Sequence, residues 1–350
     1  MCPEPVLGWD LGGAHLKVAV ADRQGRITVI CQLGCPLWMG MQHFDDAALR
    51  ALDITRGMAF DHAVTMTGEL VDLFPTREDG VRRLVDVMCR HVPAQRLRVY
   101  AGRHGFLGPR EAIGHSDQVA SANWCATASL LARRLDAGLL VDVGSTTTDI
   151  VPFYDNQVQA AGFSDHERLI NGELVYAGVV RTPVMAMARR VPVDGAWVPL
   201  MAEHFATAAD VYRLLSRLTE HADKLPSADR GDKTSLASAR RLARMVGCDL
   251  EGNRLEPWLA TAAYLAECQL QRFQDACEKV LANTALPAGA PLVGAGVGRF
   301  LVRTLATRLR RPYVDFCTLI DAERIAGRED AADCAPAVAV ACLAQLEAAA

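Results

Sequence analysis

Short apolar stretches separated by turn residues open the chain. Apolar residues dominate 6–10, 16–21 and 27–31, and the turn residues Gly12-Gly13 and 22–25 lie between them. Runs of this length bounded by glycine or aspartate are typical of strands joined by tight turns. The pattern therefore predicts a three-stranded antiparallel unit at the start of the chain.

Strands and helices alternate over the following residues. The pattern predicts a helix near 47–52 and another over the alanine-rich 123–135. It predicts a third helix between them, with one apolar face made of Val81, Leu84, Val85 and Met88. It predicts strands at 63–67, 99–100, 139–143 and 150–153. Such alternation is typical of α/β proteins, in which helices cover the faces of a sheet. We therefore expect an α/β fold.

The rest of the chain is predicted to be mostly helical. Thr207 and Asp210 have the spacing of a capping box, and 256–281 has the apolar periodicity of a long helix. Between them, 220–233 is rich in charged residues, proline and glycine, which predicts a mobile surface loop. A strand at 291–293 precedes a glycine turn and a helix at 299–310. The alanine-rich 336–350 is predicted to be a last helix that packs back on the first domain.

Length and charge narrow the class of protein. A chain of 350 residues exceeds the usual size of one hydrophobic core, so two domains with a cleft between them are expected. The net charge of −4 argues against a nucleic-acid partner, which normally requires a basic face, and leaves a small anionic substrate open. The sequence has neither a signal-peptide pattern nor a membrane-length apolar run. We therefore expect a cytoplasmic protein with no membrane partner.

The 11 cysteines have no regular spacing and no Cys-x-x-Cys pair, which favours a reducing compartment. Cys31 and Cys35 are the closest pair and precede Pro36. Zinc sites usually need a second pair of ligands, so we interpret these cysteines as ordinary small apolar residues.

A carboxylate, two glycines and a lysine follow one another in the first turn, Gly8-Trp9-Asp10-Leu11-Gly12-Gly13-Ala14-His15-Leu16-Lys17. Glycine lets a ligand approach the backbone closely, so the N–H groups of Gly12 and Gly13 are predicted to donate to phosphate oxygens. Lys17 supplies a point charge, and Asp10 is predicted to hold a magnesium ion, usually through waters. The alternative is a plain hairpin with a surface salt bridge.

A second loop, made of Asp142, Gly144, Ser145, Thr146 and Thr147, repeats this arrangement with hydroxyl groups added. The hydroxyls are predicted to donate to phosphate oxygens, and Asp142 is predicted to give the second metal contact. Consecutive hydroxyl residues at the end of an apolar strand are costly to bury without partners. Phosphate binding is therefore favoured over the alternative of a threonine-rich turn.

A third glycine turn, Gly294-Ala295-Gly296-Val297-Gly298, lies between a strand and a helix, and by itself it also fits a plain strand-to-helix turn. Its place after two carboxylate loops resembles the order of two phosphate loops and an adenosine loop in the actin, sugar kinase and heat-shock chaperone ATPase superfamily. This resemblance implies an α/β, two-domain actin-like (ribonuclease H-like) ATPase fold with the ligand cleft between the domains. It also implies phosphate contacts from Gly294 and Gly296.

Within that superfamily the sequence resembles the hydantoinase A/oxoprolinase family, and most closely its short branch, linked to tetrahydromethanopterin-dependent C1 transfer and methanofuran biosynthesis. The segments that carry the resemblance are 8–17, 120–124, 142–149, 172–176, 178–183 and 293–300. Longer members have a Gly-Gly-Thr first loop where this chain has Ala14-His15, which favours the short branch.

We expect domain I to comprise 1–135 plus 330–350 and domain II to comprise 136–329. Domain II would then hold a helical insertion at about 195–285 and the adenosine-type loop at 294–298.

The resemblance implies a transferase that joins an aminomethylfuran diphosphate to the phenol of γ-glutamyltyramine and releases diphosphate. Magnesium on Asp10 and Asp142, with Lys17 and backbone donors, would neutralise the leaving group. A phenol with a pKa near 10 needs help to lose its proton, and His15 is the candidate base. A structural role for His15 inside the hairpin is the alternative.

Four residues after the second loop resemble positions conserved in the family and are predicted to line the acceptor pocket: Arg168, Glu173, Tyr176 and Arg181. Two arginines would suit a glutamyl carboxylate. Ion pairs at a domain interface are the alternative. Asn123 is predicted to cap a helix or to point into the cleft.

Two other functions fit the same residues. An ATP-dependent small-molecule kinase or hydantoinase/oxoprolinase-type enzyme would use the same cleft, with ATP beside magnesium. A non-catalytic nucleotide-binding protein would keep the loops without the chemistry. A small phosphorylated molecule is the expected partner in each case, and the sequence leaves the oligomeric state open, a homodimer included.

Overall fold

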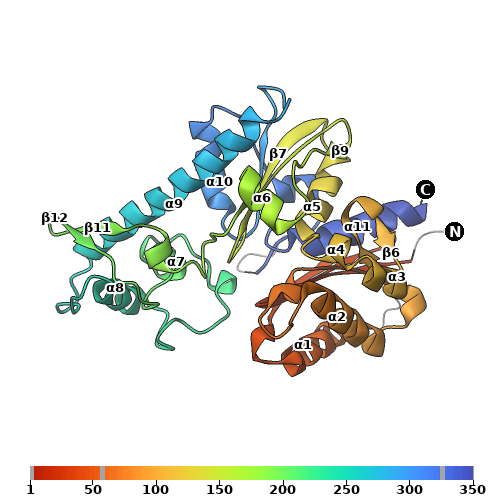
Figure 1. Ribbon diagram of the computed structural model, residues 1–350, viewed down its shortest axis with the longest axis horizontal. Coiled ribbons are helices and arrows are strands. Elements are labelled where there is room, and N and C mark those ends of the chain that lie inside the picture. The colour runs from red at the N-terminus through yellow and green to blue at the C-terminus, as the bar shows by residue number, and fades with distance from the viewer. Residues whose placement is uncertain (1–3, 56–59, 324–327, 350) are drawn as a thin grey trace.

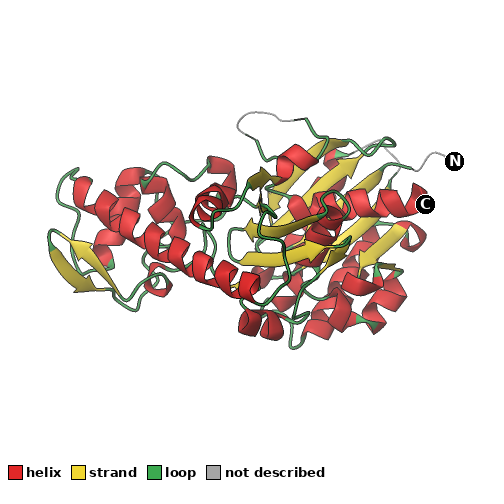
Figure 2. Ribbon diagram, turned by 90° about the horizontal axis from the view of Figure 1, so that it is seen from above, coloured by secondary structure: helices red, strands yellow, loops and turns green. Residues whose placement is uncertain are grey.

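The computed structural model describes residues 4–55, 60–323 and 328–349. Two sheets lie on either side of a central pair of helices, and a helical lobe extends from the second sheet (Figures 1 and 2).

The first sheet is mixed, with the spatial order β3-β2-β1-β4-β5-β6. Its strands are β1 (Val6–Leu11), β2 (His15–Ala21), β3 (Ile27–Gly34), β4 (Asp61–Met66), β5 (Leu97–Tyr100) and β6 (Phe106–Leu107). β1 pairs antiparallel with β2 and parallel with β4. In this register Asp10 lies between Lys17 on one side and Thr65 on the other. The predicted antiparallel unit at the start of the chain is confirmed.

The second sheet repeats this arrangement, with the order β10-β8-β7-β13-β14 and β9 paired to β8. Its strands are β7 (Ala137–Val143), β8 (Thr148–Tyr154), β9 (Gln157–Val158), β10 (Leu174–Val175), β13 (Leu292–Ala295) and β14 (Tyr313–Asp315). β7 pairs antiparallel with β8 and parallel with β13, as β1 does with β2 and β4. Asp142 therefore occupies in the second sheet the place that Asp10 has in the first.

Helices α5 (Asn123–Ala132) and α11 (Ala335–Ala349) form a shared core with the facing sides of both sheets. α11 is apolar on all sides, as expected of a helix that is buried all round. It packs closely on β1, where a Cβ on Gly8 would collide with the carbonyl oxygen of Ala337. The prediction that the tail packs back on the first part of the chain is confirmed.

The outer face of the first sheet is covered by α1 (Met41–Ile54) and α2 (Arg77–His91). Thr76 caps α2 by accepting a hydrogen bond from the Asp79 backbone N–H at 3.1 Å. The predicted apolar face of this helix is buried. Two short helices, α3 (Pro109–Gly114) and α4 (Ser116–Val119), follow β6.

The second sheet is covered by α9 (Glu256–Ala282) and α10 (Arg299–Arg308). Figure 2 shows α9 running outward to the lobe formed by a hairpin and two short helices. These elements are β11 (Arg190–Val193), β12 (Ala196–Pro199), α7 (Ala208–Leu214) and α8 (Ser235–Arg244). α6 (Asp165–Asn171) lies beside β10. The long helix and the helix after the third glycine turn are confirmed.

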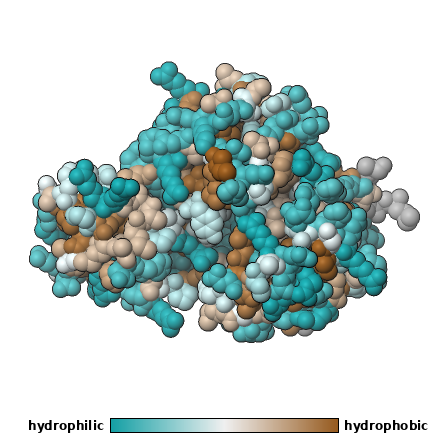
Figure 3. All heavy atoms as spheres, viewed as in Figure 1, coloured by the Kyte–Doolittle hydropathy of each residue, from teal (hydrophilic) through white to brown (hydrophobic). Residues whose placement is uncertain are grey.

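Hydrophilic residues dominate the face of the molecule drawn in Figure 3. Within the described parts of the chain, every helix is too short or too polar to cross a bilayer.

Candidate active site

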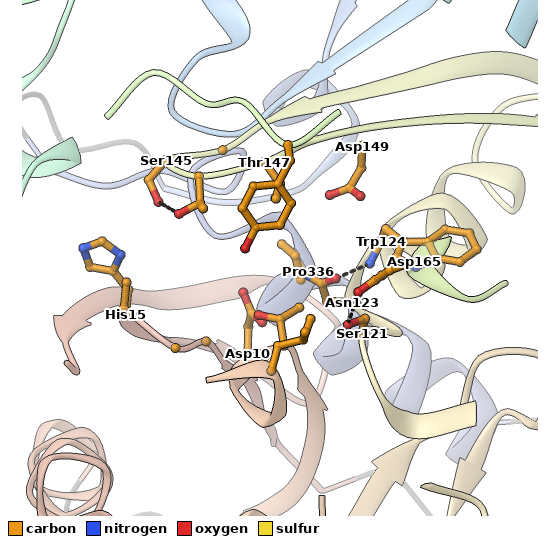
Figure 4. Close-up of a pocket in the computed structure, with 18 of the residues that line it drawn as sticks. Asp10, His15, Ser121, Asn123, Trp124, Ser145, Thr147, Asp149, Asp165 and Pro336 are labelled. Carbon is orange, nitrogen blue, oxygen red and sulfur yellow. Dashed lines mark hydrogen bonds between the residues drawn. The ribbon is translucent and has the colours of Figure 1, made fainter. Parts of the chain in front are cut away.

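The β1–β2 and β7–β8 hairpins face each other across a cavity of about 510 Å³ (Figure 4). Each hairpin turns in the same way. The Gly12 N–H donates to the carbonyl of His15 at 3.1 Å, and the Gly144 N–H donates to the carbonyl of Thr147 at 2.9 Å. The structure therefore corrects one expectation, because these two amides are already used to close their turns.

Other groups of the two turns remain as anion donors. The N–H groups of Gly13, Ser145 and Thr146 have no acceptor among the described residues. The hydroxyl groups of Ser145 and Thr146 lie 3.4 Å apart, and these residues line the cavity together with Thr147. Ser145 is held in place because its carbonyl accepts from the N–H groups of Val180 and Arg181 at 3.1 and 2.8 Å. The turns thus keep an anion cradle that includes the predicted Gly13 amide, while the amides of Gly12 and Gly144 close their own turns.

Five aspartates line the cavity, and three of them, Asp10, Asp142 and Asp149, lie on the strands of the two hairpins. Burial, followed in the same direction by Asp149, raises the pKa of Asp10 to about 6 although Lys17 opposes it. Burial also raises the pKa of Asp142 to about 7, with further contributions from Asp149 and Asp10. Burial lowers the pKa of Lys17, but the carboxylates of Asp10 and Asp142 outweigh it and the pKa is raised. Negative charge therefore exceeds positive charge around Asp10, Asp142 and Lys17.

A hydrated magnesium ion fits this excess of negative charge. Asp10 Oδ1 is buried without a hydrogen-bond partner, as expected of an oxygen that faces a cation or its water. The described residues contain no cluster of three or more His, Cys, Asp or Glu side chains that could hold a metal directly. Magnesium commonly keeps several waters and uses one or two carboxylates plus substrate phosphates. Asp10 and Asp142 match that mode.

Arg168 is buried in the wall of the cavity, and its guanidinium makes three contacts. It donates to Asp149 Oδ1 at 2.9 Å and to the carbonyl of Glu173 at 3.0 Å, and it stacks on the Trp124 ring at 4.0 Å. Burial raises the pKa of Asp149 against the lowering effect of Arg168. Arg168 thus lines the cavity as predicted, and its contacts hold Asp149, which was not among the predicted site residues.

Glu173 lies outside the cavity lining. Its carboxylate accepts from the backbone N–H groups of Ala161 at 2.6 Å and Gly162 at 3.0 Å. This position differs from the predicted substrate contact. The physical reason is that the side chain turns toward two amides of a nearby turn, which need acceptors because they are withdrawn from water.

Gly294 and Gly296 also lie outside the cavity lining, contrary to their predicted phosphate contacts. Gly296 has φ +78°, and a Cβ there would collide with the carbonyl of Val143 and with Asp142 Oδ1. A Cβ on Gly294 would lie 2.8 Å from the Tyr313 ring. Gly296 therefore allows the third turn to pack tightly against the strand that carries Asp142, and Gly294 leaves room for the Tyr313 ring.

The other predicted substrate residues also line the cavity. Tyr176 is 59% exposed. The Arg181 guanidinium lies 5.0 Å from the centre of the Trp38 ring, so this pair joins the two sides of the cleft. Asn123 lines the cavity, as one of the two alternatives predicted, and accepts from the Trp124 backbone N–H at 2.8 Å (Figure 4). It does not cap the helix, because the N-cap position of α5 is Ala122.

Apolar and aromatic side chains share the cavity lining with these polar residues. They are Trp38, Leu70, Val71, Trp124, Leu174 and Pro336. These residues come from segments far apart in the sequence, so no local motif marked them.

His15 is buried in the cavity lining, and its Nε2 has no hydrogen-bond partner. Burial is the largest cause that lowers the pKa of His15, to about 3, and the charges of Lys17 and Arg181 act in the same direction. Lys224 and Lys233 contribute as well. The imidazole is therefore neutral at neutral pH, with a lone pair or an N–H to offer a ligand.

Segment 220–233 is irregular, as predicted, but it is anchored. Lys224 Nζ donates to the carbonyl of Gln32 in β3 at 2.8 Å, and Arg213 pairs with Asp223 at 2.5 Å. Its two lysines thereby add positive charge near His15. Sequence reasoning missed them, because spacing along the chain does not show where a long loop crosses the cleft.

Six side-chain atoms in the described parts of the chain are buried without a hydrogen-bond partner. They belong to Asp10, His15, Thr65, Glu69, Trp124 and Arg168. Four of these residues line the cavity. Thr65 is the register neighbour of Asp10, and Glu69 is bonded to the cavity residue Ser121. Because native proteins rarely leave buried polar atoms unpaired, their concentration here marks a ligand site.

The fold and the site define a class of protein. A family model described as hydantoinase/oxoprolinase matches residues 61–310, and the chain belongs to this family. The family resemblance seen in the sequence and the prediction of an enzyme are confirmed.

Its relatives include a (4-{4-[2-(gamma-L-glutamylamino)ethyl]phenoxymethyl}furan-2-yl)methanamine synthase from Methanocaldococcus jannaschii. The two are 32% identical over 247 residues, which are 70% of this chain and 72% of that relative. A synthase of the same name from Methanococcus vannielii is 34% identical over 114 residues, which are 32% of this chain and 50% of that relative.

The fold is similar to that of acetone carboxylase in a nucleotide-free structure. The TM-score is 0.56 at 12% identity, and the match covers 97% of this chain and 70% of that one. At this identity the likeness concerns the fold alone. Together with the repeated sheet topology, it confirms the predicted actin-like α/β fold.

Proposed function

We propose that this chain is a transferase of methanofuran biosynthesis that joins an aminomethylfuran diphosphate to the phenol of γ-glutamyltyramine. The observation that supports it best is the composition of one cavity. The charged residues Asp10, Asp142 and Lys17 line the same cavity as the aromatic residues Trp124 and Tyr176. A substrate that combines a diphosphate with flat rings matches this lining.

The relatives point to the same chemistry. Both are named as synthases of a furan methanamine that is joined to a phenol through a phenoxymethyl ether. Forming that ether from a furan diphosphate requires the phenol oxygen to bond to the furan methylene carbon. The bond from that carbon to the diphosphate oxygen breaks, diphosphate leaves with the electron pair, and the phenol proton passes to a base or to water.

Charged residues of the cavity would bind the leaving group. Asp10 and Asp142 would hold magnesium, which would neutralise the negative charge that develops on diphosphate. Lys17, the register neighbour of Asp10, adds a cation, and the N–H groups of Gly13 and Ser145 would donate to phosphate oxygens.

His15 is neutral, and its Nε2 has no protein partner. We assign it as the group that accepts the phenol proton or a hydrogen bond from the phenol. Four cations hold its pKa down in the absence of substrate, and a bound diphosphate would offset them and raise its basicity.

The test uses purified protein with aminomethylfuran diphosphate, γ-glutamyltyramine and magnesium. We expect diphosphate release and the ether product by mass spectrometry, both dependent on magnesium and on the phenol. Absence of both products from folded protein overturns the proposal.

An ATP-dependent kinase or hydantoinase/oxoprolinase-type enzyme is the second candidate, because another cavity of about 390 Å³ opens beside Val297, Arg299 and Phe300 after the third glycine turn. Arg299 fills part of its wall and pairs with Asp333 at 2.7 Å and Asp315 at 3.4 Å. Tight ATP binding with substrate-stimulated hydrolysis would favour this candidate. ATP binding without any turnover would favour a nucleotide-binding protein.

A further inference from the structure

A buried carboxylate beside the cavity has no role in holding the diphosphate. Glu69 follows β4 and is 1% exposed, and its Oε2 has no hydrogen-bond partner. Its Oε1 accepts a hydrogen bond from the Ser121 hydroxyl at 2.9 Å. Ser121 lines the cavity, so Glu69 lies directly behind the cavity wall.

Glu69 belongs to a small network that spans the cleft. The Ser121 hydroxyl also lies 3.3 Å from Asp165 Oδ2 (Figure 4), and Asp165 pairs with Arg77 at 2.8 Å. Arg77 and Asp165 balance each other in charge. Among the described residues, Glu69 is thus the carboxylate of this network without an ion pair, and the network has one more negative than positive charge.

The titration behaviour agrees with a missing cation. Burial raises the pKa of Glu69 to about 7, and Asp165 acts in the same direction. The hydrogen bonds from its own backbone N–H and from Ser121, with the charge of Arg77, oppose the shift. A cation bound next to Glu69 would lower this pKa and keep the carboxylate ionised at neutral pH.

The network lies directly beside the first phosphate turn. The Thr67 N–H donates to the carbonyl of Leu11 at 3.0 Å, and a Cβ on Gly68 would lie 3.0 Å from that same oxygen. Along the cavity, Asp165 is close enough to raise the pKa of both Asp149 and Glu69. The acidic network therefore lies next to the carboxylates of the two phosphate hairpins.

We propose that Glu69, with Ser121 and Asp165, forms the subsite for the primary ammonium group of the furan substrate. This inference rests on the proposed function. In that substrate only the furan ring separates the aminomethyl group from the carbon that carries the diphosphate. An ammonium subsite next to the diphosphate turn fits such a spacing, and a primary ammonium offers three donors to the oxygens of this network.

The test measures binding of the furan diphosphate alone by calorimetry, with magnesium and without the phenol. Two ligands are compared, one with the aminomethyl group and one with a methyl group in its place. The wild type is expected to bind the aminomethyl ligand at least about tenfold more tightly, as a buried charge-assisted hydrogen bond provides. Glu69→Gln is expected to bind both ligands within about twofold of each other, because it keeps the size and the Ser121 contact but loses the charge.

Ser121→Ala keeps the Glu69 charge and is expected to retain part of the preference. Glu111→Gln, which changes an exposed glutamate of α3, serves as the matched control. It is expected to keep the full preference for the aminomethyl ligand. Thermal unfolding of each variant checks that it is folded. An unchanged amine preference in folded Glu69→Gln, or no preference in the wild type, overturns the subsite.

The two proposals fail separately. Amine-selective binding that depends on Glu69, without ether formation, overturns the proposed transferase and leaves the subsite. Ether formation at the same rate from both furan ligands overturns the subsite and leaves the transferase.

Discussion

Asp142 and Asp149 are register partners across the β7–β8 hairpin, and both are buried. Burial raises the pKa of both Asp142 and Asp10, and the charge of Asp149 adds to each shift. Like charges therefore lie close together at the site where a cation and a diphosphate would bind.

The first prediction concerns the pH dependence of stability. The pKa values of Asp10 and Asp142 rise on folding from 3.8 to about 6 and about 7. At a pH between the unfolded and the folded pKa values, the folded chain therefore binds more protons than the unfolded chain. The free energy of unfolding of the metal-free protein should then fall as the pH rises from about 4 to 7. Urea denaturation across this range measures the slope. Asp142→Asn should flatten it, and magnesium should restore stability at pH 8; a slope of the opposite sign contradicts the assignment.

The second prediction follows from the same two groups. Because magnesium needs the ionised carboxylates, kcat/KM should drop as the pH falls below about 7, while metal-free stability rises. Steady-state rates of diphosphate release across pH 5 to 8 test this opposition. His15 should produce no inflection near its ordinary pKa of 6.5 in the free enzyme, since its pKa is lowered to about 3.

The third prediction concerns the buried pair of Arg168 and Asp149. Arg168→Met should destabilise the protein by about 3–5 kcal/mol, because it leaves Asp149 buried without its cation. Asp149→Asn in the same chain should recover part of the loss. Arg272→Met, on the exposed surface of α9, is the matched control. Equal losses in the single and double variants would show that the pair is not coupled.

The fourth prediction compares two glycines with left-handed backbone. Gly296 has φ +78° and its Cβ position is filled by Val143 and Asp142, whereas Gly195 has φ +82° and open space around it. Gly195→Ala should cost about 1–2 kcal/mol for backbone strain alone. Gly296→Ala should cost more and also reduce kcat by displacing Asp142. Similar losses in the two variants would contradict the packing role of Gly296.

The fifth prediction separates Glu173 from Arg181. Glu173→Gln should lower the free energy of unfolding by about 1–3 kcal/mol, because it weakens the contacts to the buried amide of Gly162 and the partly buried amide of Ala161. Its KM for either substrate should stay within twofold. Arg181→Ala should instead raise KM with little change in unfolding, since Arg181 is exposed at the cavity rim. A raised KM for Glu173→Gln without a loss of stability would instead indicate that Glu173 contacts the substrate.

Much of the fold could be predicted because its signals are local. The turns at Gly12 and Gly144 interrupt apolar strands, and the apolar face of α9 repeats with helical spacing. The repeated hairpins were visible because a carboxylate ends the first strand of each. The division of the chain at 135 and 329 stays a prediction.

The contacts of individual side chains were less accessible. Glu173 and Gly296 were both predicted site residues, yet Glu173 turns toward backbone amides and Gly296 packs behind a strand. Glu69 had no motif around it, and it enters the site through Ser121, which is 52 residues away in the sequence. Such contacts depend on which segments the sheets bring together, and local patterns do not encode that.

The position of α11 between the sheets has a consequence for synthesis. Residues 335–349 follow every other helix and strand described, yet they cover the inner faces of both sheets. As the chain leaves the ribosome, α5 alone covers part of these apolar faces until α11 emerges. Nascent chains are therefore expected to engage chaperones until that point, and the cleft between the two hairpins assembles only after α11 is translated.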